Sequence, residues 1–76
     1  MDRLALTKAL QAAGIGDSAI SFSLRNDKYC LIPNGTGWVI TFNEHGVETF
    51  RQEFLSESDA CSHLLSMLTR ANGKQI

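Results

Sequence analysis

The residues best suited to acid–base chemistry are two histidines and the acids near them. His45 follows Glu44 in a segment typical of an exposed turn, and a general base of this kind needs a nucleophile or a metal close by. No such third group accompanies the pair, so we interpret both residues as surface or contact residues. His63 lies one residue away from the Leu64 and Leu65 stripe of a predicted helix, and the simpler interpretation is a helix residue at the edge of the apolar face or exposed to solvent. The sequence therefore predicts a protein that is not an enzyme.

Two further motifs resemble ligand sites. NGTG, residues 34–37, is glycine-rich, but phosphate-binding loops lead from a strand into a helix, and this stretch joins two predicted strands. Trp38 could stack on a nucleic-acid base in a basic groove, yet no Lys or Arg occurs between Pro33 and Val47. We interpret NGTG as a turn and Trp38 as a core residue.

The two cysteines, Cys30 and Cys61, both have apolar neighbours. A disulfide is possible on count alone, but the N-terminal segment does not fit a secretory signal, and buried free thiols are common. Cys61 and His63 lack the paired spacing of zinc ligands. We expect no metal and no cofactor.

Two amphipathic helices are predicted to position these residues. The first begins at Asp2 as a candidate N-cap and stops at GIGD, residues 14–17. The second follows a capping sequence at Ser56 and Asp59 and ends near Asn72-Gly73. Apolar residues recur at helical spacing in both: Leu6, Ala9, Leu10 and Ala13 in the first, and Cys61, Leu64, Leu65 and Leu68 in the second.

Four strands are predicted between the helices. AISFSL, residues 19–24, alternates apolar and serine residues, as a strand with one solvent-exposed face does. Residues 29–32 and 38–42 should pair antiparallel around Asn34-Gly35. Gly46 fits a hairpin loop of three to five residues that leads into a fourth strand, VETFRQEFL. The predicted fold is α+β: a helix, a four-stranded antiparallel meander and a helix.

We expect the helices to pack mainly on one sheet face, through Leu6, Leu10, Leu64, Leu65 and Leu68. That face would carry Ile20, Phe22, Leu24, Trp38, Ile40, Phe42 and Phe54. The other face would show Val39 and Thr41, with either Tyr29 and Leu31 or Cys30 and Ile32, and a partner could use it. The alternative is that the helices straddle the sheet and cover both faces.

Length and composition favour one small folded domain over residues 1–76, with a core at about 3–71 and a short tail at 72–76. The chain has 43% hydrophobic and 20% charged residues, which is ordinary for a globular protein. The first residues suit neither a signal peptide nor a membrane span, so we expect a cytoplasmic protein without membrane contact.

Charge is distributed unevenly along the chain. The net charge of −1 argues against a nucleic-acid binder. Residues 44–59, however, contain one base, Arg51, and most of the acids. One interpretation is that each acid is explained by its own position, because acids favour a helix N-terminus and the solvent-exposed face of a strand. The other is an acidic surface that attracts a basic protein, with these candidate partner-binding residues: Glu44, His45, Glu48, Glu53, Glu57 and Asp59.

The second half of the chain also carries a recognisable order of residues. Its elements are Tyr29-Cys30-Leu31, Gly37-Trp38-Val39, Glu44-His45-Gly46, and then Phe54, Glu57, Ala60-Cys61 and Leu64-Leu65. Over residues 29–68 this order resembles small bacterial immunity proteins of polymorphic toxin systems, of the Rhs and contact-dependent growth inhibition type. His45 departs from the pattern, in which Arg would follow the Glu.

The resemblance implies an immunity protein that binds the C-terminal domain of one cognate toxin and blocks it. Combined with the charge, it suggests a basic nuclease or a nucleotide-acting enzyme as that toxin. The free chain would be a monomer or a weak homodimer. The alternative is a non-enzymatic adaptor, or a structural protein that dimerises through the open sheet face or the edge of the first strand.

Overall fold

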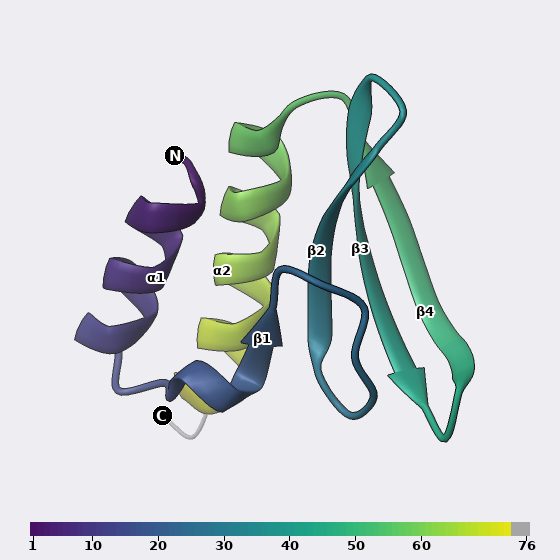
Figure 1. The fold of residues 1–76 in the computed structure, drawn as a ribbon. Helices are drawn as coiled ribbons and strands as arrows, with labels where there is room; N and C mark the ends of the chain where they lie inside the picture. Colours follow the sequence, from purple (N-terminus) through teal and green to yellow (C-terminus); the bar gives the residue numbers. More distant parts are fainter. Residues whose placement is uncertain (74–76) are drawn as a thin grey trace.

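The computed structural model describes residues 1–73 of the protein. Along the chain lie α1 (Arg3–Ala12), a short 3-10 helix η1 (Asp17–Ala19), β1 (Ile20–Ser21), β2 (Tyr29–Asn34), β3 (Gly37–Glu44), β4 (Val47–Phe54) and α2 (Glu57–Gly73) (Figure 1). The fold is α+β. Because α2 runs to Gly73, the first two residues of the predicted tail are helical, and residues 74–76 lie outside the described part.

Both helices begin with the caps predicted from the sequence, and α1 also ends at its predicted glycine. The Asp2 carboxylate accepts a hydrogen bond from the backbone N–H of Ala5 at 2.9 Å. Gly14, at φ +80°, lets the chain leave α1 with the N–H of Ile15 bonded to the carbonyl of Leu10 at 2.9 Å, which is a Schellman ending. At α2, the Ser56 hydroxyl accepts from the N–H of Asp59 at 3.1 Å.

The sheet has the strand order β1-β2-β3-β4, and it is mixed. β2, β3 and β4 form the predicted antiparallel meander, but β1 pairs with β2 in parallel, through Ile20 with Tyr29 and Ser21 with Cys30. The prediction of a fully antiparallel sheet is therefore wrong for the first pair. β1 is also only two residues long, in place of the six predicted.

Serine side chains explain why β1 ends so early. The N–H of Ser23 donates to the hydroxyl of Ser21 at 3.1 Å, and this local turn replaces the next ladder bond. For β2 to run parallel to β1, the chain must first return from the end of β1 to the level of its start. Because β1 has only two residues, the seven residues 22–28 are long enough to make this return. Phe22 and Leu24, predicted as core, are 39% and 64% exposed in this connection.

The two hairpins have two-residue turns. Between β2 and β3 the turn residues are Gly35 and Thr36, with Gly35 at φ +62°, and the predicted pairing of these strands is confirmed. Between β3 and β4 the turn is His45-Gly46, at φ +52° and +82°. Both residues are left-handed, as a type I′ turn requires, so the prediction of a longer loop is wrong.

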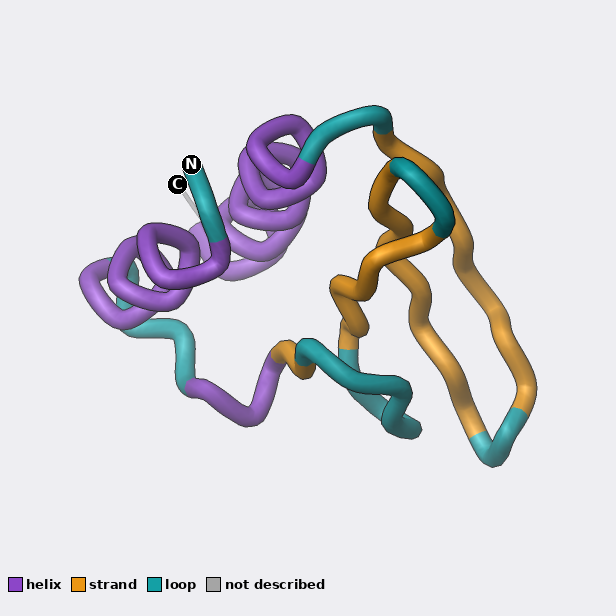
Figure 2. The backbone as a smooth tube through the Cα atoms, turned by 45° about the horizontal axis from the view of Figure 1, so that its top comes forward, coloured by secondary structure: helices purple, strands orange, loops and turns teal. Residues whose placement is uncertain are grey.

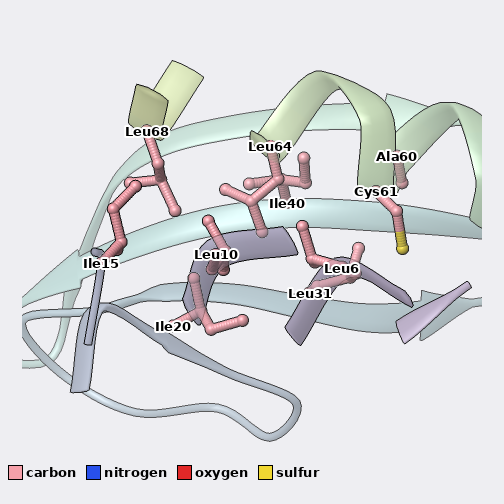
Figure 3. Packing of buried hydrophobic residues seen from close by; sticks show 10 residues of the cluster. All are labelled: Leu6, Leu10, Ile15, Ile20, Leu31, Ile40, Ala60, Cys61, Leu64 and Leu68. Carbon is pink, nitrogen blue, oxygen red and sulfur yellow. The ribbon is translucent and has the colours of Figure 1, made fainter. Parts of the chain in front are cut away.

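The core lies between the helices and one sheet face. Figures 1 and 2 show both helices on the same side of the sheet, with α2 next to the strands and α1 beyond it, and α2 contacts β3, β4 and α1. Leu31 and Ile40 are opposite each other in the sheet and meet Leu6, Leu10 and Leu64 (Figure 3). Each such side chain contributes about 1.5–3 kcal/mol when buried.

The opposite sheet face is not open at its centre. Val39 and Thr41 are each 1% exposed and Cys30 is fully buried, so the expectation that Val39 and Thr41 are displayed to solvent is wrong. Over Cys30 the cover is the connection of residues 22–28, whose Arg25 N–H donates to the thiol at 3.3 Å. Within residues 1–73, no helix is long and apolar enough to cross a membrane.

Candidate partner-binding surface

A β-bulge determines which acids of β4 share a face. Phe42 pairs with Phe50 and Asn43 with Glu48, so Thr49 is the extra residue. The Thr49 hydroxyl donates to the carbonyl of Phe42 at 3.1 Å. Without the bulge, Glu48 would lie on the opposite face from Arg51, because side chains alternate along a strand. With it, Glu48, Arg51 and Glu53 all lie on the face away from the helices.

Arg51 forms ion pairs with both acids. Its Nη1 is 3.4 Å from Glu48 Oε1, and its Nη2 is 3.2 Å from Glu53 Oε2, with Nε at 3.3 Å from the same oxygen. All three side chains are largely exposed, and exposed pairs of this kind contribute only about 0–1 kcal/mol each. The cluster keeps one excess negative charge, and its carboxylate oxygens remain accessible to solvent.

Glu44 pairs with Val47 and lies two residues after Phe42 in β3, so alternation places its side chain on the helix face, opposite to the row formed by Glu48 and Glu53. Glu44 and His45 form the end of the hairpin. Both side chains are exposed. The connection over residues 22–28 holds this turn, because the side-chain carbonyl of Asn26 accepts a hydrogen bond from the N–H of Gly46 at 3.0 Å. Glu48 lies near the turn on the face away from the helices, and Glu53 lies on the same face five residues further along β4.

The remaining two candidates, Glu57 and Asp59, lie in the first turn of α2, in the helical layer. Glu57 is occupied within the protein: its Oε2 accepts from the backbone N–H of Arg3 at 2.9 Å and from Arg3 Nε at 3.1 Å. The Arg3 guanidinium also lies 4.9 Å from the centre of the Trp38 ring, a cation–π contact. The Arg3–Glu57 pair joins α1 to α2 beside a partly buried Trp38, which packs on the core as predicted.

The structure thus brings only two of the candidate residues, Glu48 and Glu53, onto one face. Glu44 lies on the opposite face of the β3–β4 hairpin, His45 lies in its turn, and Glu57 and Asp59 belong to the start of α2. Sequence reasoning missed the connection over residues 22–28, which brings Arg25 beside the hairpin residues Asn43 and Gly46. Residues of this connection and the hairpin surround a shallow depression of about 210 Å³: Leu24, Arg25, Asn26, Asn43 and Gly46.

Cys30 is the buried polar centre of that connection. Its thiol accepts from the N–H of Arg25 at 3.3 Å and lies within donating distance of the carbonyls of Arg25, at 3.3 Å, and Lys28, at 3.6 Å. The N–H of Asp27 donates to the carbonyl of Asn43 at 2.7 Å. These bonds attach the connection to the sheet. The signal in the sequence was Asn26-Asp27, since these residue types tolerate the positive φ that Asp27 adopts.

The second thiol, Cys61, belongs to the core and has no reactive partner in the part of the chain that is described. Burial, and after it the nearby Glu57 carboxylate, raises the pKa of this thiol. Both cysteines are free. Across residues 1–73, no group of three or more His, Cys, Asp and Glu side chains is arranged to hold a metal ion.

Comparison with known proteins adds no relative. The chain matches no protein-family model, no curated protein and no solved structure.

Proposed function

We propose that this protein is an immunity protein, which binds the C-terminal domain of one cognate bacterial toxin and neutralises it by occlusion. The observation that carries the proposal is the exposed row of Glu48 and Glu53, which the bulge places on one face of β4 with Arg51 between them. The order of residues over 29–68 that resembles immunity proteins supports it independently. No catalytic step is assigned to the chain.

The charge of the row suggests the chemistry of the partner. Carboxylates in a row can occupy the positions that phosphates would take on a basic surface, as on a nuclease or a nucleotide-acting enzyme. Arg51 holds Glu48 and Glu53 in place without neutralising both, so the row is partly preorganised and loses little side-chain freedom on binding. Occlusion then requires only that the hairpin covers the entrance to the toxin's site.

The experiment is binding to the toxin domain encoded next to this protein's gene. The variant E48Q/E53Q removes both carboxylates of β4, and Q11K/A12K makes the same net change in charge on the exposed end of α1. We expect E48Q/E53Q to slow association about tenfold at low salt, and Q11K/A12K to change it much less. The difference should shrink at about 1 M salt, where the screening length is about 3 Å.

Equal rates for the two variants would refute the role of the row. A neighbouring toxin domain that remains fully active with an excess of the pure protein would refute neutralisation itself.

A further inference from the structure

β4 is a long sheet edge with nothing on its outer side among the described residues. It has eight residues and one strand neighbour, β3, while the other edge of the sheet is the two-residue β1. Figures 1 and 2 show no other described element beside the outer edge of β4. Such an edge presents unpaired backbone N–H and C=O groups to any chain that can align with it.

The pairing register determines which residues of β4 carry these unpaired groups. Asn34 and Gly37 close a two-residue turn and form a hydrogen-bonded pair, and such pairs alternate with non-bonded ones along a ladder. Counting from this turn, the backbone groups of Val39, Thr41 and Asn43 point toward β2. The bond from Asp27 to the carbonyl of Asn43 agrees with this direction.

The intervening residues of β3 therefore bond to β4. Ile40 and Gln52 form a hydrogen-bonded pair, and so do Trp38 with Phe54 and Phe42 with Phe50, two positions away on either side. The backbone groups of Arg51 and Glu53, which lie between these positions, are left pointing outward. A second antiparallel strand must bond to these two residues, and the bulge at Thr49 ends the regular edge beyond them.

We propose that two copies of this protein pair antiparallel through β4, with Arg51 of each copy opposite Glu53 of the other. In this register the two-fold axis passes through Gln52. The outward backbone groups of each copy meet those of the other, and two Arg51–Glu53 pairs form across the edge. The dimer is a second interaction that does not require the toxin, but it engages Arg51 and Glu53 of the row, so a toxin bound to these residues would compete with it.

Charge selects this register among those that the hydrogen bonds allow. Placing Arg51 opposite Arg51 sets two cations together, and placing Glu53 opposite Glu53 sets two anions together; both arrangements are destabilising for directly opposed strand residues. The proposed register avoids both. Charged edge residues usually keep sheets from pairing, but here the alternation of sign makes the edge complementary to its own copy.

The same register also matches the side chains on the helix face. Phe50 of each copy lies opposite Phe54 of the other, and both are partly buried aromatic residues packed against the core. Aromatic cross-strand pairs stabilise sheets. Leu55, which is 92% exposed at the end of β4, comes opposite Thr49 of the second copy. The result is one continuous sheet of eight strands, with all helices on one face.

The first test is sedimentation of the pure protein from about 10 µM to about 1 mM. We expect the mass to rise with concentration from 8.4 kDa to twice that value. R51E and E53R should each weaken dimerisation at least about tenfold, since each opposes like charges twice. Mixed in equal amounts, these two variants should form a heterodimer, because every pair across the edge then joins an acid of one copy to a base of the other.

A constant mass of 8.4 kDa for the natural chain at all concentrations would overturn the proposal. So would a mixture of the two folded variants that associates no better than either alone.

A crosslink tests the register itself. Q52C should form an intermolecular disulfide under mild oxidation, because position 52 meets itself across a non-bonded pair with Cβ atoms about 4.5–5.5 Å apart. E48C, also exposed on β4, is the matched control and should crosslink much more slowly, since it lies far from its own copy. Faster crosslinking of E48C than of Q52C would overturn the register.

Discussion

Replacing Thr41 by Val should stabilise the protein. Thr41 is 1% exposed in the middle of β3, and its Oγ1 has no hydrogen-bond partner among the described residues. An unpaired buried hydroxyl costs about 1–3 kcal/mol, and the methyl group that replaces it removes this cost at nearly the same volume. We expect the free energy of unfolding to rise by about 1–2 kcal/mol, and Tm by about 4–8 °C per kcal/mol for a domain of this size.

The assay is urea unfolding followed by circular dichroism, with two controls. T69V removes a hydroxyl that does donate, to the carbonyl of Leu65 at 2.8 Å, and should lower stability by about 0.5–1 kcal/mol. T41S keeps the hydroxyl and loses the methyl group, and should be destabilising. A loss of about 1 kcal/mol or more in T41V would refute the reasoning, because it would mean that the hydroxyl is hydrogen-bonded.

Three other changes probe the turns and the second thiol. An added Cβ at Gly37 would overlap the backbone carbonyl of Phe54, so G37A should cost about 1–3 kcal/mol in urea unfolding, whereas G16A, with ordinary φ and no close contact, should cost nothing. H45N should add about 0.5–1 kcal/mol by the same measurement, because Asn tolerates the left-handed backbone that His45 adopts at φ +52°. Burial raises the pKa of Cys61, so the unfolded chain releases this proton first; the resulting stability is complete below about pH 8.5 and is lost as pH rises toward the folded pKa. A pH series of unfolding curves should show the natural chain losing stability above that pH relative to C61A, and parallel curves would contradict the assignment.

The parts of the fold that could be predicted are those specified by neighbouring residues. The Asp2 cap, the Ser56 cap and the β2–β3 hairpin all depend on bonds within a few positions. The parallel placement of β1 could not be predicted, because the connection that returns the chain to β2 is held by contacts distant in the sequence, such as the bond between Asn26 and Gly46, twenty positions away. Alternation of apolar residues over 19–24 was also ambiguous, since it does not reveal that the Ser21 side chain ends the strand.

The candidate surface also depends on contacts that the local sequence does not reveal. Charge counting identified the acids of β4, but the odd spacing between Glu48 and Glu53 places them on opposite faces of a regular strand. Only the bulge at Thr49 brings both beside Arg51. The bond between Glu57 and Arg3 spans fifty-four positions, so nothing in the sequence near Glu57 indicates that it is already engaged.

The contact between α1 and α2 has a consequence for synthesis in the cell. α1 is synthesised before the strands and α2, yet its buried residues Leu6 and Leu10 pack against α2, which is made after every strand. Until α2 emerges, the apolar face of the nascent meander is incompletely covered, and α1 lacks its main packing partner. The native state is therefore completed only after translation of α2, and a chain interrupted before that point would be a substrate for chaperones and proteases.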